Sequence, residues 1–358
     1  MAGQRTAARR RRAALICLLV ALATAAALLL LQNIAIAAYF PRLSRLTTDF
    51  SAAYLQRELK VMAVRQPQAI FLGDSVLWGY ALPPRQTAIA ILSSHGCTCR
   101  NLSFKSGNPA NDYFLARLFV ASGIRPKAVV LELNQAVFNE ADDYYRTLAP
   151  GVASLSGAFL TPEDRASLTL TADQSENRVP AWLDRTLSGL SLLYAMRSDI
   201  RAVLYGDTEP SARPRLRPEL FEGTYNLLPL NDKNIGVRYL KATADSLRQA
   251  RIPLVAFLTP TNHALLHDYI DNPRYRANGA YIAGIVERRG GRVMNLDAAF
   301  PQSEFIDDTH LTAAGQRRLA DALAAALEPY MKRSVGVLGD RAPVARLHPR
   351  ARLKPEFR

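Results

Sequence analysis

A serine, an aspartate and a histidine occur where they could form a nucleophilic site. Ser75 directly follows an apolar stretch in AIFLGDSVLWG, and Asp307 and His310 lie three residues apart in FIDDTHL. A serine hydroxyl is a weak nucleophile until a base removes its proton. Histidine can act as that base when a carboxylate holds its second ring nitrogen and stabilises the imidazolium. These residue types therefore suit acyl transfer through an acyl-serine, with Asp308 competing with Asp307 for the carboxylate role.

Acyl transfer also needs hydrogen-bond donors aimed at the oxygen that becomes negative. The backbone N–H groups of Ser75 and Gly107 and the side-chain amide of Asn134 are the candidate donors. Each position has a simpler interpretation. Ser75 could cap the helix that follows it, and Asn134 could close a turn. The acidic residues before His310 could merely lead into a helix. The occurrence of all these groups in one chain favours the chemical interpretation.

Five short apolar stretches predict the strands that would position these residues. They are Ala69–Leu72, Arg100–Phe104, Ala128–Leu133, Pro253–Leu258 and Arg292–Leu296. Helix-like stretches alternate with them: Asn111–Ala121, Lys233–Ala250, Tyr275–Arg288 and Thr312–Lys332. This alternation predicts an α/β structure with a parallel sheet that is buried on both faces. Sites gather at the carboxyl ends of parallel strands, and the candidate residues follow four of these strands, so we expect them to meet there.

The blocks Gly73-Asp74-Ser75, Gly107, Asn134 and Asp307-x-x-His310, in this order, resemble the SGNH (GDSL-type) hydrolase superfamily. The resemblance implies a flavodoxin-like three-layer α/β/α sandwich with a central parallel sheet. It implies Ser75 as the nucleophile, His310 as the general base and Asp307 as its partner. It further implies an oxyanion hole formed by Ser75, Gly107 and Asn134.

The segment LTPTNH, at the end of the fourth predicted strand, resembles a segment near the site in some of these proteins. Asn262 and His263 are therefore candidates for contact with substrate. His263 and His267, four residues apart, could bind a metal on a helix, but no third ligand lies near them in the sequence, so a surface or packing role is favoured. We expect no metal and no cofactor. Trp78 and Tyr80 are expected to pack beside the serine turn.

The N-terminus predicts a membrane segment. Residues 1–12 hold five arginines and no acid, and the next nineteen residues, 13–31, carry no charge. About 20 apolar residues span a bilayer as a helix, and the flanking arginines favour a cytoplasmic N-terminus. We therefore expect a basic cytoplasmic segment over 1–12 and a single transmembrane anchor over 13–40. A signal peptide cleaved near 35–37 is the alternative.

The remaining chain is divided by composition. The formal net charge of +14 is concentrated at the two ends, since residues 332–358 carry eight Lys or Arg against two acids. Basic ends suit anionic lipid or solubility better than a nucleic-acid groove, so we expect no nucleic-acid partner. We expect a stalk or helix over 41–66, an SGNH hydrolase-like domain over 67–332 with an insertion at about 135–230, and a basic flexible tail over 333–358.

The three cysteines predict no disulfide framework. Cys17 lies in the apolar N-terminal segment, and Cys97 and Cys99 have a spacing at which disulfide geometry is strained.

An SGNH-like domain on an N-terminal anchor is similar to exported proteins of bacterial envelopes, including those that O-acetylate exopolysaccharides beside a membrane-bound acyltransferase. This resemblance implies an acylated glycan or lipid substrate on the periplasmic side of the cytoplasmic membrane, with such an acyltransferase as a partner. Water as the acceptor makes the protein an esterase, and a sugar hydroxyl makes it an O-acyltransferase. Both remain open here. The alternative from another class is a catalytically silent glycan-binding or assembly protein of the envelope.

Overall fold

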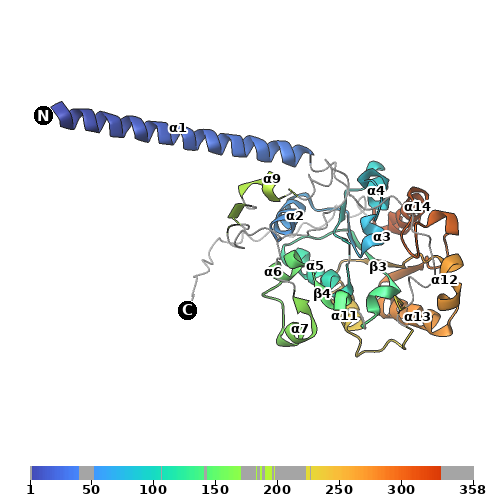
Figure 1. The fold of residues 1–358 in the computed structure, drawn as a ribbon. Coiled ribbons are helices and arrows are strands. Elements are labelled where there is room, and N and C mark those ends of the chain that lie inside the picture. Colours follow the sequence, from blue (N-terminus) through green and yellow to red (C-terminus); the bar gives the residue numbers. More distant parts are fainter. Residues whose placement is uncertain are drawn as a thin grey trace, which may run out of the picture.

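The computed structural model describes most of the chain (Figure 1). The described residues are 2–39, 52–105, 107–140, 143–170, 183, 186–187, 190–195, 197, 223–225 and 227–331. The predicted tail over 333–358, much of the predicted insertion and residues 41–51 of the predicted stalk lie outside these ranges.

A five-stranded sheet, in which every pairing is parallel, forms the centre of the domain. Its strands are β1 (Ala69–Leu72), β2 (Cys99–Asn101), β3 (Ala128–Leu133), β6 (Leu254–Leu258) and β7 (Arg292–Asn295). They lie in the order β2-β1-β3-β6-β7, which is the 2-1-3-4-5 order of flavodoxin-like sheets. The predicted fold class is therefore confirmed. β2 ends at Asn101, earlier than predicted, because the Asn101 side chain accepts the Ser103 N–H and turns the chain.

Helices cover both faces of the sheet (Figure 1). Alternate side chains of β1 enter opposite cores: Ile70 and Leu72 on one face, Ala69 and Phe71 on the other. The first core is completed by α2 (Ala52–Arg65), α5 (Pro109–Ala121), α11 (Ile235–Gln249) and α13 (Pro273–Glu287). The second is completed by α4 (Ala88–Ser94) and α14 (Ala313–Met331). The result is three layers with the sheet in the middle.

Asparagine side chains set where three of these helices begin. Asn108, Asn234 and Asn272 each accept a backbone N–H from the first turn of α5, α11 and α13 respectively. Such caps satisfy donors that have no partner within the helix. The proline that follows Asn108 and Asn272 has a φ angle already suited to a first helical position. α5 and α13 therefore begin two residues earlier than the apolar pattern predicted.

The start of the predicted insertion folds against α5. It contains α6 (Pro150–Leu155), α7 (Pro162–Ser167) and a two-stranded parallel sheet of β4 (Thr147–Leu148) and β5 (Thr169–Leu170). The side-chain amides of Asn108 and Asn111 both donate to the Thr147 carbonyl at 2.9 Å. The remaining described elements are α9 (Leu192–Ala195), α12 (His263–Ile270) and the 3-10 turns η2 (Pro84–Gln86), η4 (Asp143–Arg146) and η6 (Gln302–Glu304).

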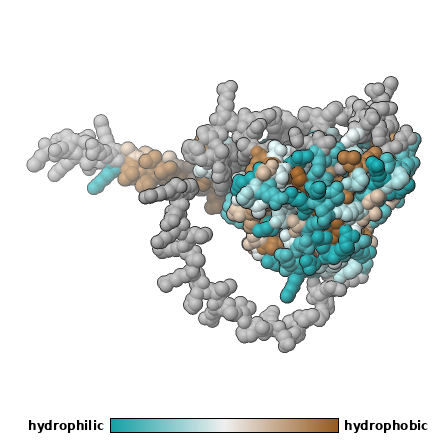
Figure 2. Space-filling model, turned by 90° about the horizontal axis from the view of Figure 1, so that it is seen from below, coloured by the Kyte–Doolittle hydropathy of each residue, from teal (hydrophilic) through white to brown (hydrophobic). Residues whose placement is uncertain are grey.

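The N-terminal segment forms one long helix, α1 (Ala2–Tyr39). The most apolar 18-residue stretch between Arg12 and Ile36 has a mean hydropathy of 2.9, and none of that stretch is buried in the protein. Figure 2 shows the hydrophobic residues of this helix in brown, outside the body of the molecule. The helix is long and apolar enough to cross a membrane, and a signal sequence would have the same properties. Retention of the helix as an anchor therefore stays a prediction.

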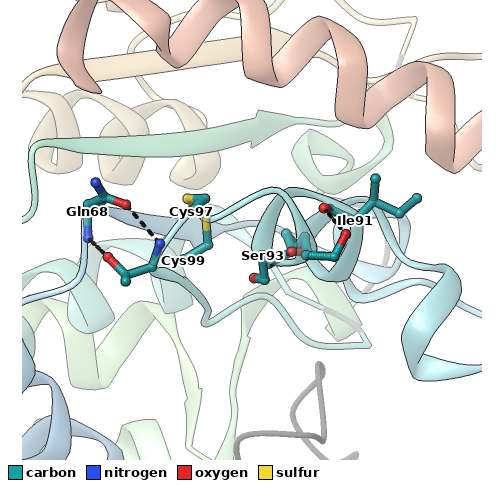
Figure 3. Close-up of a disulfide and its surroundings, with 8 residues drawn as sticks. Gln68, Ile91, Ser93, Cys97 and Cys99 are labelled. Atoms are coloured by element: carbon teal, nitrogen blue, oxygen red, sulfur yellow. Dashed lines mark hydrogen bonds between the residues drawn. A yellow bond between two sulfur atoms is a disulfide. The ribbon is translucent and has the colours of Figure 1, made fainter. Parts of the chain in front are cut away.

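Cys97 and Cys99 form a disulfide (Figure 3). The expectation of no disulfide was wrong. The two Cα atoms lie 5.2 Å apart, within the ordinary range for a disulfide. Thr98 between them is held by Gln68: the Thr98 N–H donates to the Gln68 side chain and the Thr98 carbonyl accepts the Gln68 N–H, both at 2.9 Å. These hydrogen bonds to Gln68 hold the backbone between Cys97 and Cys99 in a bend that brings the two sulfur atoms together.

Candidate active site

Ser75 is the first residue of a single helical turn, α3 (Ser75–Trp78), at the carboxyl end of β1. Asp74, not Ser75, caps this turn, because its Oδ1 accepts the Val76 N–H at 3.0 Å. Gly79 ends the turn with a positive φ of 83°, a conformation that glycine adopts without a steric penalty. The Ser75 hydroxyl therefore does not serve as this cap.

Gly73 lets the chain pass close to β3 before this turn. Its φ is +152°, and a Cβ placed there would lie 2.5 Å from the Glu132 Cβ. A side chain at this position would therefore displace either Glu132 or the serine turn.

The three residues predicted to be catalytic are hydrogen-bonded in a chain. His310 Nε2 lies 2.8 Å from Ser75 Oγ, and His310 Nδ1 lies 2.6 Å from Asp307 Oδ2. The other carboxylate oxygen of Asp307 accepts the backbone N–H groups of Thr309 and His310 at 3.1 and 2.7 Å. These backbone bonds fold the loop so that the carboxylate lies beside the imidazole ring. The structure thus brings Ser75, His310 and Asp307 together at the predicted edge of the sheet.

Asp308 is hydrogen-bonded to Tyr225, although its carboxylate lies within 4.8 Å of a ring nitrogen of His310. Its Oδ2 accepts a hydrogen bond from the Tyr225 hydroxyl at 3.1 Å, and its side chain is buried. Burial, together with the charge of Asp307, raises the pKa of Asp308 to about 7. Of the two neighbouring carboxylates, Asp307 is the one that holds the histidine.

The pKa values of the His310–Asp307 pair favour a charged imidazolium. Burial would raise the pKa of Asp307, but its hydrogen bonds to the His310 ring and to two backbone N–H groups hold the pKa below its usual value. Burial would lower the pKa of His310, but the hydrogen bond and charge of Asp307 outweigh it and raise the pKa. A proton taken from Ser75 would therefore be stabilised on His310.

The backbone N–H of Ser75 differs from the neighbouring N–H groups of the turn in its hydrogen bonding. The N–H groups of Asp74 and Leu77 donate to Glu132 Oε2 at 3.1 and 3.3 Å, and that of Val76 donates to Asp74. Within the described part of the chain, the Ser75 N–H has no acceptor. It is therefore the donor of this turn that is available to an oxyanion.

Asn134 follows β3 directly and is buried. Its Nδ2 donates to Asp74 Oδ2 at 2.7 Å, and its Oδ1 accepts the Ala136 N–H at the start of the 3-10 turn η3 (Gln135–Phe138). The turn-closing role is therefore real. A side-chain amide carries two hydrogens, so this bond leaves one unused, and service of Asn134 in an oxyanion hole stays a prediction.

Gly107 packs directly against the turn that carries Ser75. A Cβ on Gly107 would lie 2.0 Å from the Gly73 carbonyl oxygen, so only glycine permits this approach. Its N–H donates to the Phe104 carbonyl at 2.9 Å. The structure thus gives Gly107 a steric role, and its service as an oxyanion donor stays a prediction.

Asn262 and His263 lie beside the site but contact protein groups. Asn262 is buried; its Nδ2 donates to the Asp307 carbonyl at 3.0 Å and its Oδ1 caps α12. His263 Nε2 lies 3.0 Å from Asp297 Oδ2, and the Tyr275 hydroxyl donates to the other oxygen of Asp297 at 2.7 Å. Asn262 thus supports the Asp307 loop, and contact of either residue with substrate stays a prediction.

The aromatic residues after Ser75 have different positions. Trp78 is buried, as expected of a packing residue. The Tyr80 ring lies against the His310 imidazole, with their centroids 4.3 Å apart, and the Lys105 ammonium lies 5.3 Å from the centroid of Tyr80. Tyr80 therefore forms part of the wall that orients the histidine.

One group of acidic and histidine side chains in the described part of the chain is compact enough to hold a metal ion. It consists of Asp307, Asp308 and His310, whose ligand atoms lie within 4.8 Å of one another. Both ring nitrogens of His310 are already paired, one with Ser75 and one with Asp307. This arrangement fits proton transfer better than metal coordination.

Sequence reasoning missed Glu132 and the anchoring role of Asp74. Glu132 lies within the apolar run AVVLEL, which predicts a strand. A charged residue inside a strand that is buried on both faces is itself a signal, because such residues are almost never buried unless they are paired. Here Glu132 binds two N–H groups of the Ser75 turn.

Comparison with known proteins finds similar folds only among solved structures: no family model and no curated protein matches the chain. One similar structure is a G-D-S-L family lipolytic protein from Desulfitobacterium hafniense DCB-2, with 10% identity, 72% of this chain and 97% of that chain covered, and a TM-score of 0.36. Another is TesA, with 13% identity, coverage of 73% and 98%, and a TM-score of 0.35. A GDSL-family protein is thus among the structures that this chain resembles.

Proposed function

We propose that the protein is a serine ester hydrolase or O-acyltransferase of the SGNH type. The observation that carries this proposal is the hydrogen-bonded chain from Asp307 through His310 to Ser75, with contacts of 2.6 and 2.8 Å. The free N–H of Ser75 and the side-chain amide of Asn134, which is bonded to Asp74 next to that serine, add the donors that acyl transfer requires.

The geometry supports a two-step reaction. His310 Nε2 takes the proton of Ser75 Oγ as the oxygen bonds to the acyl carbon of the substrate. The resulting oxyanion is stabilised by the N–H of Ser75 and the free amide hydrogen of Asn134. The tetrahedral intermediate collapses as His310 returns the proton to the departing alcohol, which leaves the acyl group on Ser75. An acceptor hydroxyl then attacks the acyl carbon, gives its proton to His310, and releases Ser75 with its proton restored.

The acceptor decides between the two activities. Water makes the protein an esterase, and a sugar hydroxyl makes it an O-acyltransferase, with no change in the roles of Ser75 and His310. We propose an acylated glycan or lipid of the cell envelope as the substrate, with a membrane-bound acyltransferase as a partner.

Two features support a location outside the cytoplasm. The helix α1 could hold the protein in a membrane, with five arginines before its apolar part. The Cys97–Cys99 disulfide belongs to oxidising compartments, because cytosolic thiols are kept reduced. We therefore propose a single-pass protein of the bacterial cytoplasmic membrane whose body is extracytoplasmic.

A catalytically silent binding protein is the alternative. Such a protein has no need to keep the serine hydroxyl within hydrogen-bond reach of an imidazole. The 2.8 Å contact between Ser75 and His310, backed by Asp307, favours the enzyme.

The test compares the full-length wild type with Ser75→Ala in detergent, using p-nitrophenyl acetate with and without a polysaccharide acceptor. We expect Ser75→Ala to abolish release of nitrophenol, and acceptor-dependent acetylation of the polysaccharide to mark the transferase. Ser94→Ala, at an exposed serine on α4, is the matched control and should behave as the wild type. Equal turnover by the wild type and Ser75→Ala would refute the nucleophile.

A further inference from the structure

We propose that Glu132 is a positioning residue that shares a proton with Asp74 and so holds the Ser75 turn with only the Ser75 N–H left for an oxyanion. The proposal deepens the function proposed above and rests on Ser75 as the nucleophile. It concerns the buried acids behind the serine, none of which takes part in the proton transfer between Ser75 and His310.

Glu132 connects three segments of the chain. It projects from β3, and its Oε2 accepts the backbone N–H groups of Asp74 and Leu77 at either side of Ser75. Its Oε1 accepts a hydrogen bond at 3.1 Å from the hydroxyl of Thr259, the residue that directly follows β6. Gly73 supplies the space for this side chain, because a Cβ there would lie 2.7 Å from Glu132 Oε2. The serine turn is therefore held against two central strands by one carboxyl group.

Buried carboxyl groups occupy the N–H groups of the turn around Ser75. Glu132 binds the N–H groups of Asp74 and Leu77, and Asp74 binds that of Val76. The second oxygen of Asp74 holds the amide of Asn134. The position of both proposed oxyanion donors thus depends on the contact between Asp74 and Glu132.

These acids lie close together without a counter-charge. Asp74, Asp112 and Glu132 are only 6%, 4% and 5% exposed. In the described part of the chain no lysine, arginine or histidine forms an ion pair with them. Asp112 and Glu132 both line a small cavity of about 10 Å³. Neighbouring carboxylates in a low-dielectric interior cannot all ionise, so a proton must be retained among them.

Glu132 is the group that keeps the proton. Burial raises its pKa well above the usual range, and the charge of Asp74 and a side-chain hydrogen bond to Asp74 raise it further. The two side-chain oxygens of Asp74 accept hydrogen bonds from the Val76 N–H and the Asn134 amide. Asp112 faces the same group from α5, and burial and the charge of Asp74 raise its pKa as well. If Glu132 lost its proton, the Glu132 and Asp74 carboxylates would both be charged and would repel each other beneath Ser75.

The first test uses substitutions at Glu132 in the full-length protein. A glutamine can donate its amide N–H to Asp74 in place of the proton while its carbonyl accepts the backbone N–H groups. Glu132→Ala removes every contact, and we expect about a 100-fold loss of kcat, the effect of a misplaced reacting group. Glu132→Gln should keep most of the activity that Glu132→Ala loses. In the wild type, kcat should decline at alkaline pH as Glu132 loses its proton, and Glu132→Gln should show no such decline. Equal losses in the two variants, or an unchanged alkaline limb in Glu132→Gln, would overturn the proposal.

A second measurement does not depend on catalysis. An acid whose pKa is raised by folding stabilises the protein below its unfolded pKa, and this stability is lost as pH rises through the folded pKa. In the Ser75→Ala background, Tm should therefore fall with rising pH more steeply with Glu132 than with Glu132→Gln. A Tm difference that does not change with pH would mean that Glu132 is ionised and would overturn the shared proton. If the Tm difference between Glu132 and Glu132→Gln does change with pH but the wild type hydrolyses no ester, the shared proton stands and only the proposed function is refuted.

Glu58 is the matched control. It is a buried acid on α2, outside the site, and burial raises its pKa. Glu58→Gln should leave the alkaline limb of the activity profile unchanged. If it removed that limb as Glu132→Gln does, the effect would reflect general stability and the proposal would be wrong.

Discussion

Replacement of Asp307 by asparagine should set the histidine in the wrong tautomer. The carboxylate accepts three N–H groups: Oδ1 accepts those of Thr309 and His310, and Oδ2 accepts the ring Nδ1–H of His310. Asparagine has one acceptor oxygen, and keeping both backbone bonds turns its amide nitrogen toward the ring. Nδ1 must then accept a hydrogen bond, so the ring proton moves to Nε2, which faces Ser75 and can no longer act as a base.

The expected cost follows from this tautomer. A wrongly protonated histidine in a Ser-His-Asp triad lowers kcat by about 10⁴, which corresponds to about 5.5 kcal/mol of transition-state stabilisation. Hydrolysis of p-nitrophenyl acetate near neutral pH measures kcat, and thermal unfolding shows whether Asp307→Asn still folds. The structure supplies a control one residue away. Asp308→Asn removes a carboxylate that bonds Tyr225 and not the ring, so its kcat should stay close to that of the wild type.

A loss of less than about tenfold in a folded Asp307→Asn protein would refute this reasoning, because tenfold is only about 1.4 kcal/mol. An equal or larger loss in Asp308→Asn would mean that the neighbouring carboxylate is the functional partner.

Four further outcomes are expected. The acidic limb of the kcat/KM profile should lie above the usual histidine pKa of about 6.5, because Asp307 raises the pKa of His310 and only the neutral ring is a base; a limb below that value in a pH titration would contradict the hydrogen-bonded pair. Asn134→Ala should lower kcat by about 10² to 10³, the cost of one oxyanion donor, and a change confined to KM would remove it from that role. Gly107→Ala should destabilise the protein by about 1 to 3 kcal/mol and so lower Tm, because its Cβ would lie 2.0 Å from the Gly73 carbonyl oxygen, and it should also lower kcat. An unchanged Tm would show that the loop can move to make room for the methyl group. Protease added outside spheroplasts should digest the body of the protein, and protection would refute an extracytoplasmic location.

The strands could be predicted because their signal is local. β1 and β3 have the bounds that the apolar runs indicate, since a strand buried on both faces is mostly apolar and ends where a polar turn begins. The end of β2 was predicted three residues too late, because it depends on a side chain. Asn101 bonds the Ser103 N–H and the Leu77 carbonyl, and the second of these partners is supplied by another segment.

The disulfide was missed for a related reason. The spacing of Cys97 and Cys99 makes a bond unfavourable in an average chain, but Gln68 holds Thr98 between them with hydrogen bonds to its backbone. That partner lies 30 residues away in the sequence. No pattern around the cysteines could have indicated it.

The sequence by itself determined which groups could react and at which strand ends they stand. Ser75, Asp307 and His310 follow apolar runs, and parallel strands place such positions at one edge. Only the tertiary structure decided that Asp307 and not Asp308 holds the ring, that Gly107 is needed for space, and that Glu132 lies beneath the serine. These outcomes depend on which side chain meets which backbone group across distant segments. Burial makes each such contact selective, because a buried polar group without a partner is costly.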